Sequence, residues 1–306
     1  MGSVPRVLAL CGAAVSVLAL FFTRKPNMRT ITFSMLAMAL LALPASAQTL
    51  ERIKQTGELK LGYRTDAAPL SFSDERGKPA GYSPLVCAGV AQAIATELQM
   101  SDLLATFHPV DATDRFDKVA SGEIDLLCGA ATITLSRREL VDFSVPTYVD
   151  GTAVMLPKEA GEDLSALIGK KVGVRSGTTT LDALNNTMQK AGVDADVVRF
   201  ADHQAGLAAM QKGEIDAYFA DQSILFYLAY SYDATQSFKV TNEILTIEKH
   251  GLAMARGDAD FRLLVDRAIS GLFENGTMAD LFQQALPGAK PGAAIQAMGL
   301  MSPTVP

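Results

Sequence analysis

Beyond the first 47 residues, short hydrophobic runs alternate along the chain with segments in which hydrophobic residues recur every three or four positions. The runs, such as 124–128 and 171–174, have the length of buried strands. In one of the longer segments, Val86, Val90 and Ile94 fall on a single face of a helix. This alternation predicts α/β units with mostly parallel strands.

The alternating pattern occurs twice, and the tetrapeptide Gly-Glu-Ile-Asp marks both copies, at 122–125 and 213–216. In each copy it ends a predicted helix with a glycine turn and begins a strand. The first copy is expected to contain strands at 59–64, 105–107 and 124–128, with helices beginning at Ser83 and spanning 113–120. The second is expected to contain strands at 171–174, 197–200 and 217–220, with helices at 178–191, 203–211 and 221–230.

Two crossing segments, near 152–156 and 247–254, are predicted to connect the copies as two lobes. The first lobe is expected to comprise 48–146 together with 248–306, including a long amphipathic helix at 258–274, and the second lobe 147–247. The tail from Pro287 carries no predicted element. Because open α/β sheets bind ligands beyond the carboxyl ends of their strands, we expect a ligand cleft between the lobes.

Two hydrophobic runs precede this periodic region. The second, 31–43, follows Met28 and leads into small residues that end at Ala47, which is typical of a signal peptide cleaved after that residue. The first, 7–22, is shorter than the roughly 20 residues of a bilayer span. It is either a stretch upstream of a true start at Met28, which we favour, or a membrane tether. We therefore expect 1–47 to be a leader and the mature protein to be exported to the periplasm.

Cleavage after residue 47 would remove four basic residues and no acidic ones, leaving 23 basic and 33 acidic residues and a net charge of −10. Such a surface repels nucleic acid and anionic lipid. The spacing of the three cysteines and three histidines matches no zinc site, so no metal or other cofactor is expected. Cys87 and Cys128 either form a disulfide in an oxidising compartment or act as small buried hydrophobic residues.

Polar residues follow both strands that the repeated tetrapeptide begins. Thr132 and Arg137 follow the first strand, and Asp221 follows the second. A guanidinium and a hydroxyl suit a carboxylate, whereas a carboxylate suits an ammonium, so the two walls together suit an α-amino acid. Thr178 and Thr179, at the start of a predicted helix, would hold the same α-carboxylate from the second lobe. Singly, each of these residues could instead cap a helix or lie in solvent.

Five segments together resemble the periplasmic amino-acid-binding proteins of ABC importers, the solute-binding family 3, over about residues 49–285. They are LERIKQTGELKLGYRTDAAPLSF, GKPAGYSPLVC, GEIDLLCGAATITLSRRELVDFSVPTY, GKKVGVRSGTT and GEIDAYFADQS. The resemblance implies the type II periplasmic-binding-protein fold, with two α/β lobes joined by two hinge strands and a ligand cleft between them. It also implies delivery of an amino acid to membrane permease subunits, and we expect a monomer. The family's amino-acid-binding positions match Thr132, Arg137, Thr178, Thr179 and Asp221.

Further positions are similar to the glutamate/aspartate-binding branch of this family. Gly-Tyr-Arg ending at Arg64, Asp-Arg ending at Arg115 and Asp-His ending at His203 match its positions, and their positive charge would suit a second ligand carboxylate. Two ligand-binding positions depart from the branch. Ala130 replaces a serine, and Arg175 replaces a small residue and resembles the lysine of the glutamine-binding branch. We therefore predict L-glutamate or L-aspartate as the ligand.

Three other functions are alternatives on this fold. A cyclohexadienyl dehydratase-like enzyme would need a cleft carboxylic acid with a raised pKa, for which Asp66 and Asp221 are the candidates. Because the sequence contains no Ser-His-Asp or paired-carboxylate pattern, we predict a binding protein without catalytic residues. A binder of a neutral polar amino acid such as glutamine is the remaining alternative. A membrane-receptor sensor would need a span and an output domain, and 7–22 is the only candidate span.

Overall fold

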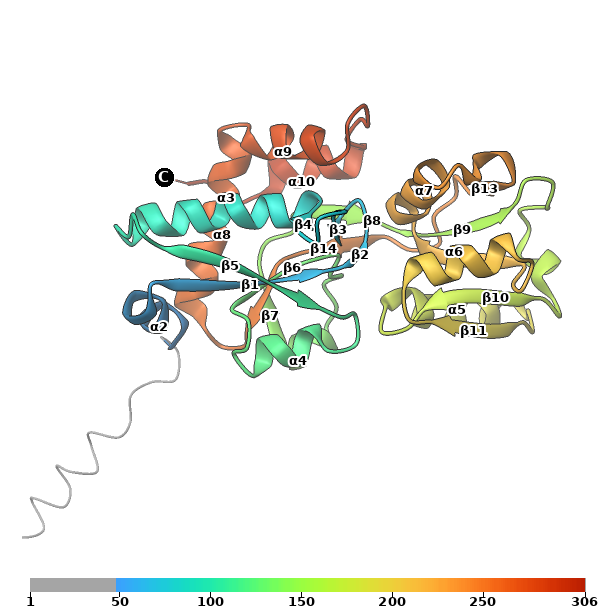
Figure 1. Ribbon diagram of the computed structural model, residues 1–306, viewed down its shortest axis with the longest axis horizontal. Coiled ribbons are helices and arrows are strands. Elements are labelled where there is room, and N and C mark those ends of the chain that lie inside the picture. The colour runs from blue at the N-terminus through green and yellow to red at the C-terminus, as the bar shows by residue number, and fades with distance from the viewer. Residues whose placement is uncertain (1–47, 306) are drawn as a thin grey trace, which may run out of the picture. The chain divides into compact units, whose positions relative to one another are not determined.

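Two five-stranded sheets form the framework of residues 48–305, the part of the chain that the computed structural model describes (Figure 1). In each sheet three neighbouring strands are parallel, and the other two are antiparallel to their neighbours. The first sheet has the order β5 (Leu104–Val110), β1 (Glu58–Arg64), β6 (Leu126–Cys128), β15 (Ala253–Ala255) and β7 (Val141–Phe143). The second has the order β11 (Asp196–Phe200), β10 (Lys171–Arg175), β12 (Ala217–Asp221), β9 (Thr152–Pro157) and β13 (Phe238–Val240).

The two sheets therefore repeat one topology, which confirms the prediction of two α/β lobes. All strands of the first sheet lie within the predicted ranges 48–146 and 248–306, and those of the second lie within 147–247. The lobe boundaries themselves stay a prediction, and the predicted leader, 1–47, lies outside the described residues.

Helices cover both faces of each sheet, as α/β lobes require. In the first lobe, α3 and α4 pack on the sheet, and α3 also packs against α8 and α9. In the second lobe, α5, α6 and α7 pack on the sheet. The α-helices are α2 (Gln48–Thr56), α3 (Tyr82–Glu97), α4 (Arg115–Ala120), α5 (Thr179–Ala191), α6 (His203–Gln211), α7 (Gln222–Ser231), α8 (Ala259–Glu274), α9 (Thr277–Ala285) and α10 (Ala293–Met301). The short 3-10 helices are η2 (Arg137–Glu139), η3 (Leu164–Leu167) and η4 (Ala234–Gln236).

Two short strands form a ladder where the chain passes between the lobes. β8 (Tyr148–Asp150) leads toward the second sheet, β14 (Glu248–His250) leads back to the first, and the two pair antiparallel. We call this pair the hinge ladder. A small sheet of β2 (Asp66–Ala67), β3 (Ser71–Ser73) and β4 (Pro79–Ala80) follows β1.

The repeated tetrapeptide performs the same structural task in both lobes. Its glycines, Gly122 and Gly213, have φ values of 74° and 69°, which L side chains rarely adopt, so each can end the preceding helix. Each aspartate then binds the neighbouring strand through a hydrogen bond and so fixes where the following strand starts. Asp125 Oδ2 accepts the Lys60 amide at 2.7 Å, and Asp216 Oδ2 accepts the Lys171 amide at 2.9 Å. The sequence repeat thus reports a repeated strand start at the centre of each sheet.

The start of α3 differs from the predicted cap at Ser83. The helix begins at Tyr82, after Gly81, and no side chain caps it. The amides of Tyr82 and Ser83 donate instead to the carbonyls of Pro69 and Leu70, at 3.1 and 2.8 Å. The loop before the helix therefore provides acceptors for the first two amides of α3.

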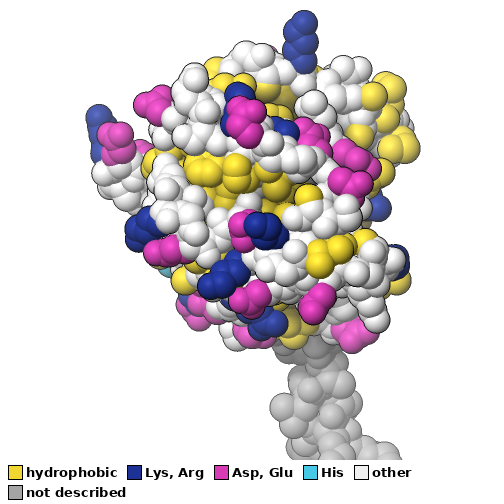
Figure 2. All heavy atoms as spheres, turned by 90° about the vertical axis from the view of Figure 1, so that its right-hand side faces the viewer, with side chains coloured by type: hydrophobic (Ala, Val, Ile, Leu, Met, Phe, Trp, Pro, Cys, Tyr) yellow, Lys and Arg dark blue, Asp and Glu magenta, His cyan; other side chains and the backbone are white. Residues whose placement is uncertain are grey.

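A disulfide joins Cys87 in α3 to Cys128 at the end of β6. Within 48–305, no helix has the length and hydrophobicity needed to cross a bilayer. Figure 2 shows the second-lobe side of the molecule, where acidic and basic side chains surround a band of hydrophobic ones.

Candidate functional site

A small pocket lies where strands of the two sheets end. Nine of the ten predicted ligand-binding residues line it, and Arg175 alone does not. Thr180 and Ile224 also line it, although the sequence analysis did not select them. The lining residues are Arg64, Arg115, Ala130, Thr132, Arg137, Thr178, Thr179, Thr180, His203, Asp221 and Ile224.

The topology explains why residues so distant in sequence meet here. Arg64 and Asp221 are the last residues of β1 and β12, and Thr132 follows β6 by four positions. Thr178 precedes α5 and therefore lies at the carboxyl end of β10. Because carboxyl ends of parallel strands share one edge of a sheet, each lobe presents its polar residues along a single edge.

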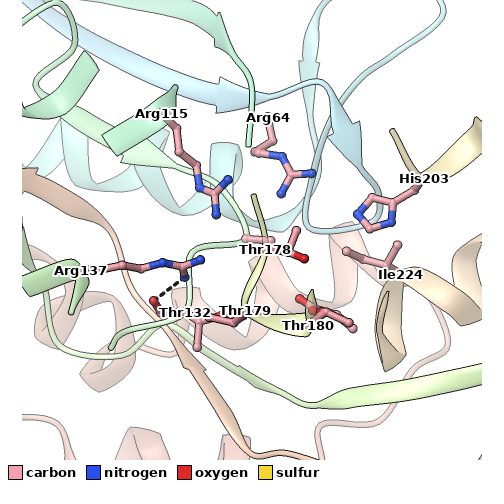
Figure 3. A pocket seen from close by; sticks show the side chains of 11 residues that line it. Arg64, Arg115, Thr132, Arg137, Thr178, Thr179, Thr180, His203 and Ile224 are labelled. Atoms are coloured by element: carbon pink, nitrogen blue, oxygen red, sulfur yellow. Dashed lines mark hydrogen bonds between the residues drawn. The ribbon is translucent and has the colours of Figure 1, made fainter. Parts of the chain in front are cut away.

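Three guanidinium groups point into the same space (Figure 3). Arg64 donates through Nε and Nη2 to Asp66 Oδ1, at 2.8 and 2.6 Å. Burial by itself would raise the pKa of Asp66, but Arg64 and Arg175 together lower it. Arg137 donates through Nη1 to the carbonyl of Thr132 at 2.8 Å.

Arg115 is the most confined of these cations. Its side chain donates to the carbonyls of Ala112 and, at 3.2 Å, Gly177, while its buried Nε has no hydrogen-bond partner. Its pKa is well below the usual value because the group is buried and because Arg64 and Arg137 add positive charge nearby. An anion bound among these groups would relieve that repulsion.

His203 is not the cation that the sequence predicted. Burial, with the charge of Arg64 nearby, lowers its pKa to about 3, so the imidazole is neutral near pH 7. Its Nδ1 lies 3.0 Å from the Tyr218 hydroxyl, while its buried Nε2 has no hydrogen-bond partner. When Nδ1 accepts the tyrosine proton, Nε2 carries the remaining proton and can donate to a ligand.

Carboxyl groups gather on the opposite side of the pocket. Burial and the nearby carboxylates of Glu248 and Asp150 raise the pKa of Asp221 well above its usual value. Asp221 Oδ2 lies 3.5 Å from His250 Nε2, but burial lowers the pKa of His250 to about 4, so the histidine supplies no positive charge near pH 7. A cation beside Asp221 would therefore stabilise its ionised form.

Glu248, in the hinge ladder, is a residue that the sequence analysis missed. Its carboxylate accepts hydrogen bonds from the hydroxyls of Thr132 and Thr179, both at 2.6 Å. The alternation of Glu248 and His250 as buried residues around exposed Lys249 was the available signal, but a three-residue strand gives too short a pattern to interpret.

Arg175 lies beside the pocket, where it links the two lobes. It donates from β10 to Asp66 Oδ2 at 2.9 Å and to Asp111 Oδ2 at 2.6 Å, both carboxylates belonging to the first lobe. Its predicted contact with a ligand stays a prediction. Within residues 48–305 no cluster of histidine, cysteine and acidic side chains has the arrangement of a metal site.

The chain belongs to the bacterial extracellular solute-binding proteins, family 3, whose pattern it matches over residues 59–287. It is 30% identical to the L-glutamate/L-aspartate-binding protein of Pseudomonas aeruginosa, an alignment that covers 80% of this chain and 83% of that protein. It is 26% identical to the glutamate/aspartate import solute-binding protein of Salmonella typhimurium, with coverages of 84% and 88%. Among solved structures it is similar to the solute receptor for L-cysteine of Neisseria gonorrhoeae, with a TM-score of 0.69, 25% identity and coverages of 81% and 98%.

The fold is accordingly the type II periplasmic-binding-protein fold that the sequence predicted. The suspected membership of the family, and the likeness to its glutamate/aspartate-binding branch, are both confirmed by these similarities.

Proposed function

We propose that the protein binds L-glutamate or L-aspartate in the pocket between its lobes and delivers it to the permease subunits of an ABC importer. In this proposal it acts in the periplasm as an exported monomer and catalyses no reaction. The names of the two relatives support the ligand class. The concentration of guanidinium groups in one small pocket supports an acidic ligand.

The α-groups of the amino acid have partners on both lobes. Asp221 supplies a carboxylate for the ammonium, and the raised pKa of Asp221 falls when that cation arrives. Arg137 supplies a guanidinium for the α-carboxylate. The first amides of α5 can add donors, because the Thr178 hydroxyl donates to the Arg175 carbonyl and does not cap the helix.

The side-chain carboxylate has its partners on the remaining wall, formed by Arg64, Arg115 and His203. The observation that carries the proposal is the unpaired, buried Nε of Arg115 among like charges. Such a group is costly to leave without a partner, and an anionic oxygen would satisfy it.

Glutamine is the second candidate, and one feature of the pocket favours it. Asp66 already balances the charge of Arg64, and His203 is neutral, so fewer free cations face the side chain than the sequence implied. An amide oxygen could accept from the same donors.

The raised pKa of Asp221 also fits the general acid of a dehydratase, whereas Asp66, with its lowered pKa, does not.

A thermal-shift panel tests these three hypotheses together. The purified protein is melted with each of the twenty amino acids, and with prephenate and arogenate. We expect L-glutamate and L-aspartate to raise Tm most, since ligand at a hundredfold excess over Kd adds about 2.7 kcal/mol to stability. A larger shift with glutamine would assign the neutral ligand. Turnover of prephenate or arogenate, followed by product formation, would assign an enzyme instead.

A further inference from the structure

Glu248 holds a buried carboxylate against an unusual set of donors. The residue is only 4% exposed, and four threonine hydroxyls donate to its two oxygens. These threonines come from both lobes and from the segment just before β14; they are Thr132, Thr152, Thr179 and Thr246. No lysine or arginine is among these partners, so the carboxylate is satisfied by hydroxyl protons.

The two oxygens of Glu248 face different surroundings. Oε1 accepts from Thr152 at 3.0 Å and Thr246 at 2.9 Å, and neither of these residues lines the pocket. Oε2 accepts from Thr132 and Thr179, which both line it. One oxygen therefore anchors the side chain, and the other determines how two pocket hydroxyls are oriented.

A count of protons shows what those two hydroxyls can offer a ligand. Each threonine hydroxyl has one proton and two acceptor lone pairs. Thr132 and Thr179 both direct their proton to Glu248 Oε2, and their own oxygens lie 3.1 Å apart. Their remaining lone pairs can accept hydrogen bonds, but neither hydroxyl has a second proton to donate to a ligand carboxylate.

The ionised form of Glu248 is the one that fits this arrangement. Burial would raise its pKa, but the hydrogen bonds from Thr132, Thr179 and Thr246, together with the nearby His250, lower it. The group therefore stays a carboxylate near pH 7 and accepts both protons. A protonated Glu248 would itself donate and could not orient the two hydroxyls in this way.

We propose that Glu248 is a positioning residue that turns the Thr132 and Thr179 oxygens into acceptors for the ligand's α-ammonium, so that the site selects α-amino acids over α-hydroxy acids of the same skeleton. The inference rests on the proposed function. It reverses the expectation from the sequence that these hydroxyls donate to the α-carboxylate.

The match is one of donors to acceptors. An ammonium has three N–H donors, and Thr132, Thr179 and Asp221 offer an acceptor each. An α-hydroxyl has a single proton and leaves two of these acceptors without a partner. Leaving buried polar groups unpaired is the strongest way in which a site rejects a near-identical ligand.

The test compares L-glutamate with (S)-2-hydroxyglutarate, which differ only in the α-substituent. Dissociation constants are measured by calorimetry, with displacement of the weaker ligand where needed, for the wild type and Glu248→Met. Methionine has a similar length, but its thioether sulfur is only a weak acceptor, so both threonines can direct a proton into the pocket. We expect the wild type to prefer L-glutamate. In the variant, the ratio of the two dissociation constants should be at least tenfold smaller.

Two further variants keep the outcome decisive. Thr179→Val removes one of the proposed acceptors and should also reduce the preference, which provides the answer if Glu248→Met does not fold. Thr246→Val is the matched control: it removes a hydroxyl from the other oxygen of Glu248, so it should lower the ligand-free Tm but leave the preference within about twofold.

The inference is overturned if the preference is unchanged in Glu248→Met or Thr179→Val, or if the wild type binds both ligands equally. It is likewise overturned if Thr246→Val reduces the preference as much as Glu248→Met, since Glu248 would then act only through stability. If no amino acid binds the wild type, the proposed function itself fails, and that result precedes any variant.

Discussion

Three carboxyl groups lie close together where the pocket meets the hinge ladder, and they share the negative charge unequally. Hydrogen bonds from threonine hydroxyls lower the pKa of Glu248, whereas burial and the neighbouring carboxylates raise the pKa of Asp221. Burial also raises the pKa of Asp150, to about 6, although the Ser223 hydroxyl and the Gly151 amide donate to it. Between pH 3.8 and about 6, the ligand-free protein therefore holds a proton at Asp150 that an ordinary aspartate would release.

Because Asp150 holds this proton, the difference in stability between Asp150→Asn and the wild type should depend on pH. The folded wild type binds it up to about pH 6, and the unfolded chain only up to about 3.8, so the stability it provides is complete below pH 3.8 and is lost as the pH rises through 6. Asparagine carries no such charge. We expect the variant to have a higher ligand-free Tm than the wild type at pH 7, with a difference that shrinks toward pH 5.

The difference from the wild type matters because other groups change over the same range. His203 and His250, neutral in the fold, make stability fall as the pH drops below about 6.5 in both proteins. Asp196→Asn, at an exposed position of β11, is the control and should show no pH-dependent difference. A Tm difference between Asp150→Asn and the wild type that stays constant from pH 7 to pH 5 would mean that Asp150 is already ionised at pH 5.

Much of the pocket could be predicted from the sequence, because strand ends can be located from local patterns. Arg64, Thr132 and Asp221 follow recognisable strands, and strand ends of one sheet must meet. The protonation of His203 and the role of Glu248 could not be predicted. Both depend on partners far away in sequence, such as Tyr218 for the histidine and Thr132 for the glutamate.

At the scale of elements, the repeat of Gly-Glu-Ile-Asp was informative because its glycine turn is local and its aspartate and isoleucine contact the neighbouring strand of the same sheet. Ile124 and Ile215 are buried beside Gly62 and Gly173, where an added Cβ would lie 2.2 and 2.5 Å from the isoleucine Cδ1. By contrast, α10 was not foreseen. Its polar residues are few, so it shows no amphipathic pattern, and it packs against β8 and α8, which a local pattern does not contain.

The disulfide between α3 and β6 leads to a prediction about stability. It closes a loop of 41 residues and joins a surface helix to a central strand. A crosslink of that span is worth about 4 kcal/mol in the chain-entropy description. We expect the double variant Cys87→Ala and Cys128→Ala to lose a few kcal/mol in the free energy of unfolding, measured by urea denaturation.

Wild-type protein unfolded and refolded in the presence of a reducing agent provides the comparison, since it lacks the bond but keeps both sulfur atoms. Its loss of stability should approach that of the double variant. Equal stability of the oxidised and reduced proteins would show that the bond contributes nothing at this position.

At the scale of the whole molecule, the described lobes make contact through charged and polar groups. Arg175 reaches from the second lobe to Asp66 and Asp111 of the first, and Arg115 donates to Gly177 in the other direction. Because Arg175 does not line the pocket, we expect its ion pairs to act on how the lobes meet.

Arg175→Met should therefore weaken all ligands alike. Fewer molecules would have their lobes in contact, and apparent affinity falls in proportion to the fraction that can bind. We expect Kd for L-glutamate and L-aspartate to rise by the same factor, on the order of three to ten, with an unchanged ratio between them. Calorimetry measures both values.

Arg199→Met, an exposed arginine on the neighbouring strand β11, controls for the loss of one positive charge and should change neither constant. A loss confined to one of the two ligands would instead give Arg175 the direct ligand contact that the sequence suggested.

Gly177 limits what this crevice can tolerate over evolution. Its φ is +72°, and a Cβ there would sit 2.9 Å from the carbonyl oxygen of Ala112 on the facing lobe. Even a single methyl group would therefore clash with the first lobe where the two lobes meet. A side chain at this position would therefore carry two costs, one from the strained backbone and one from its contact with Ala112.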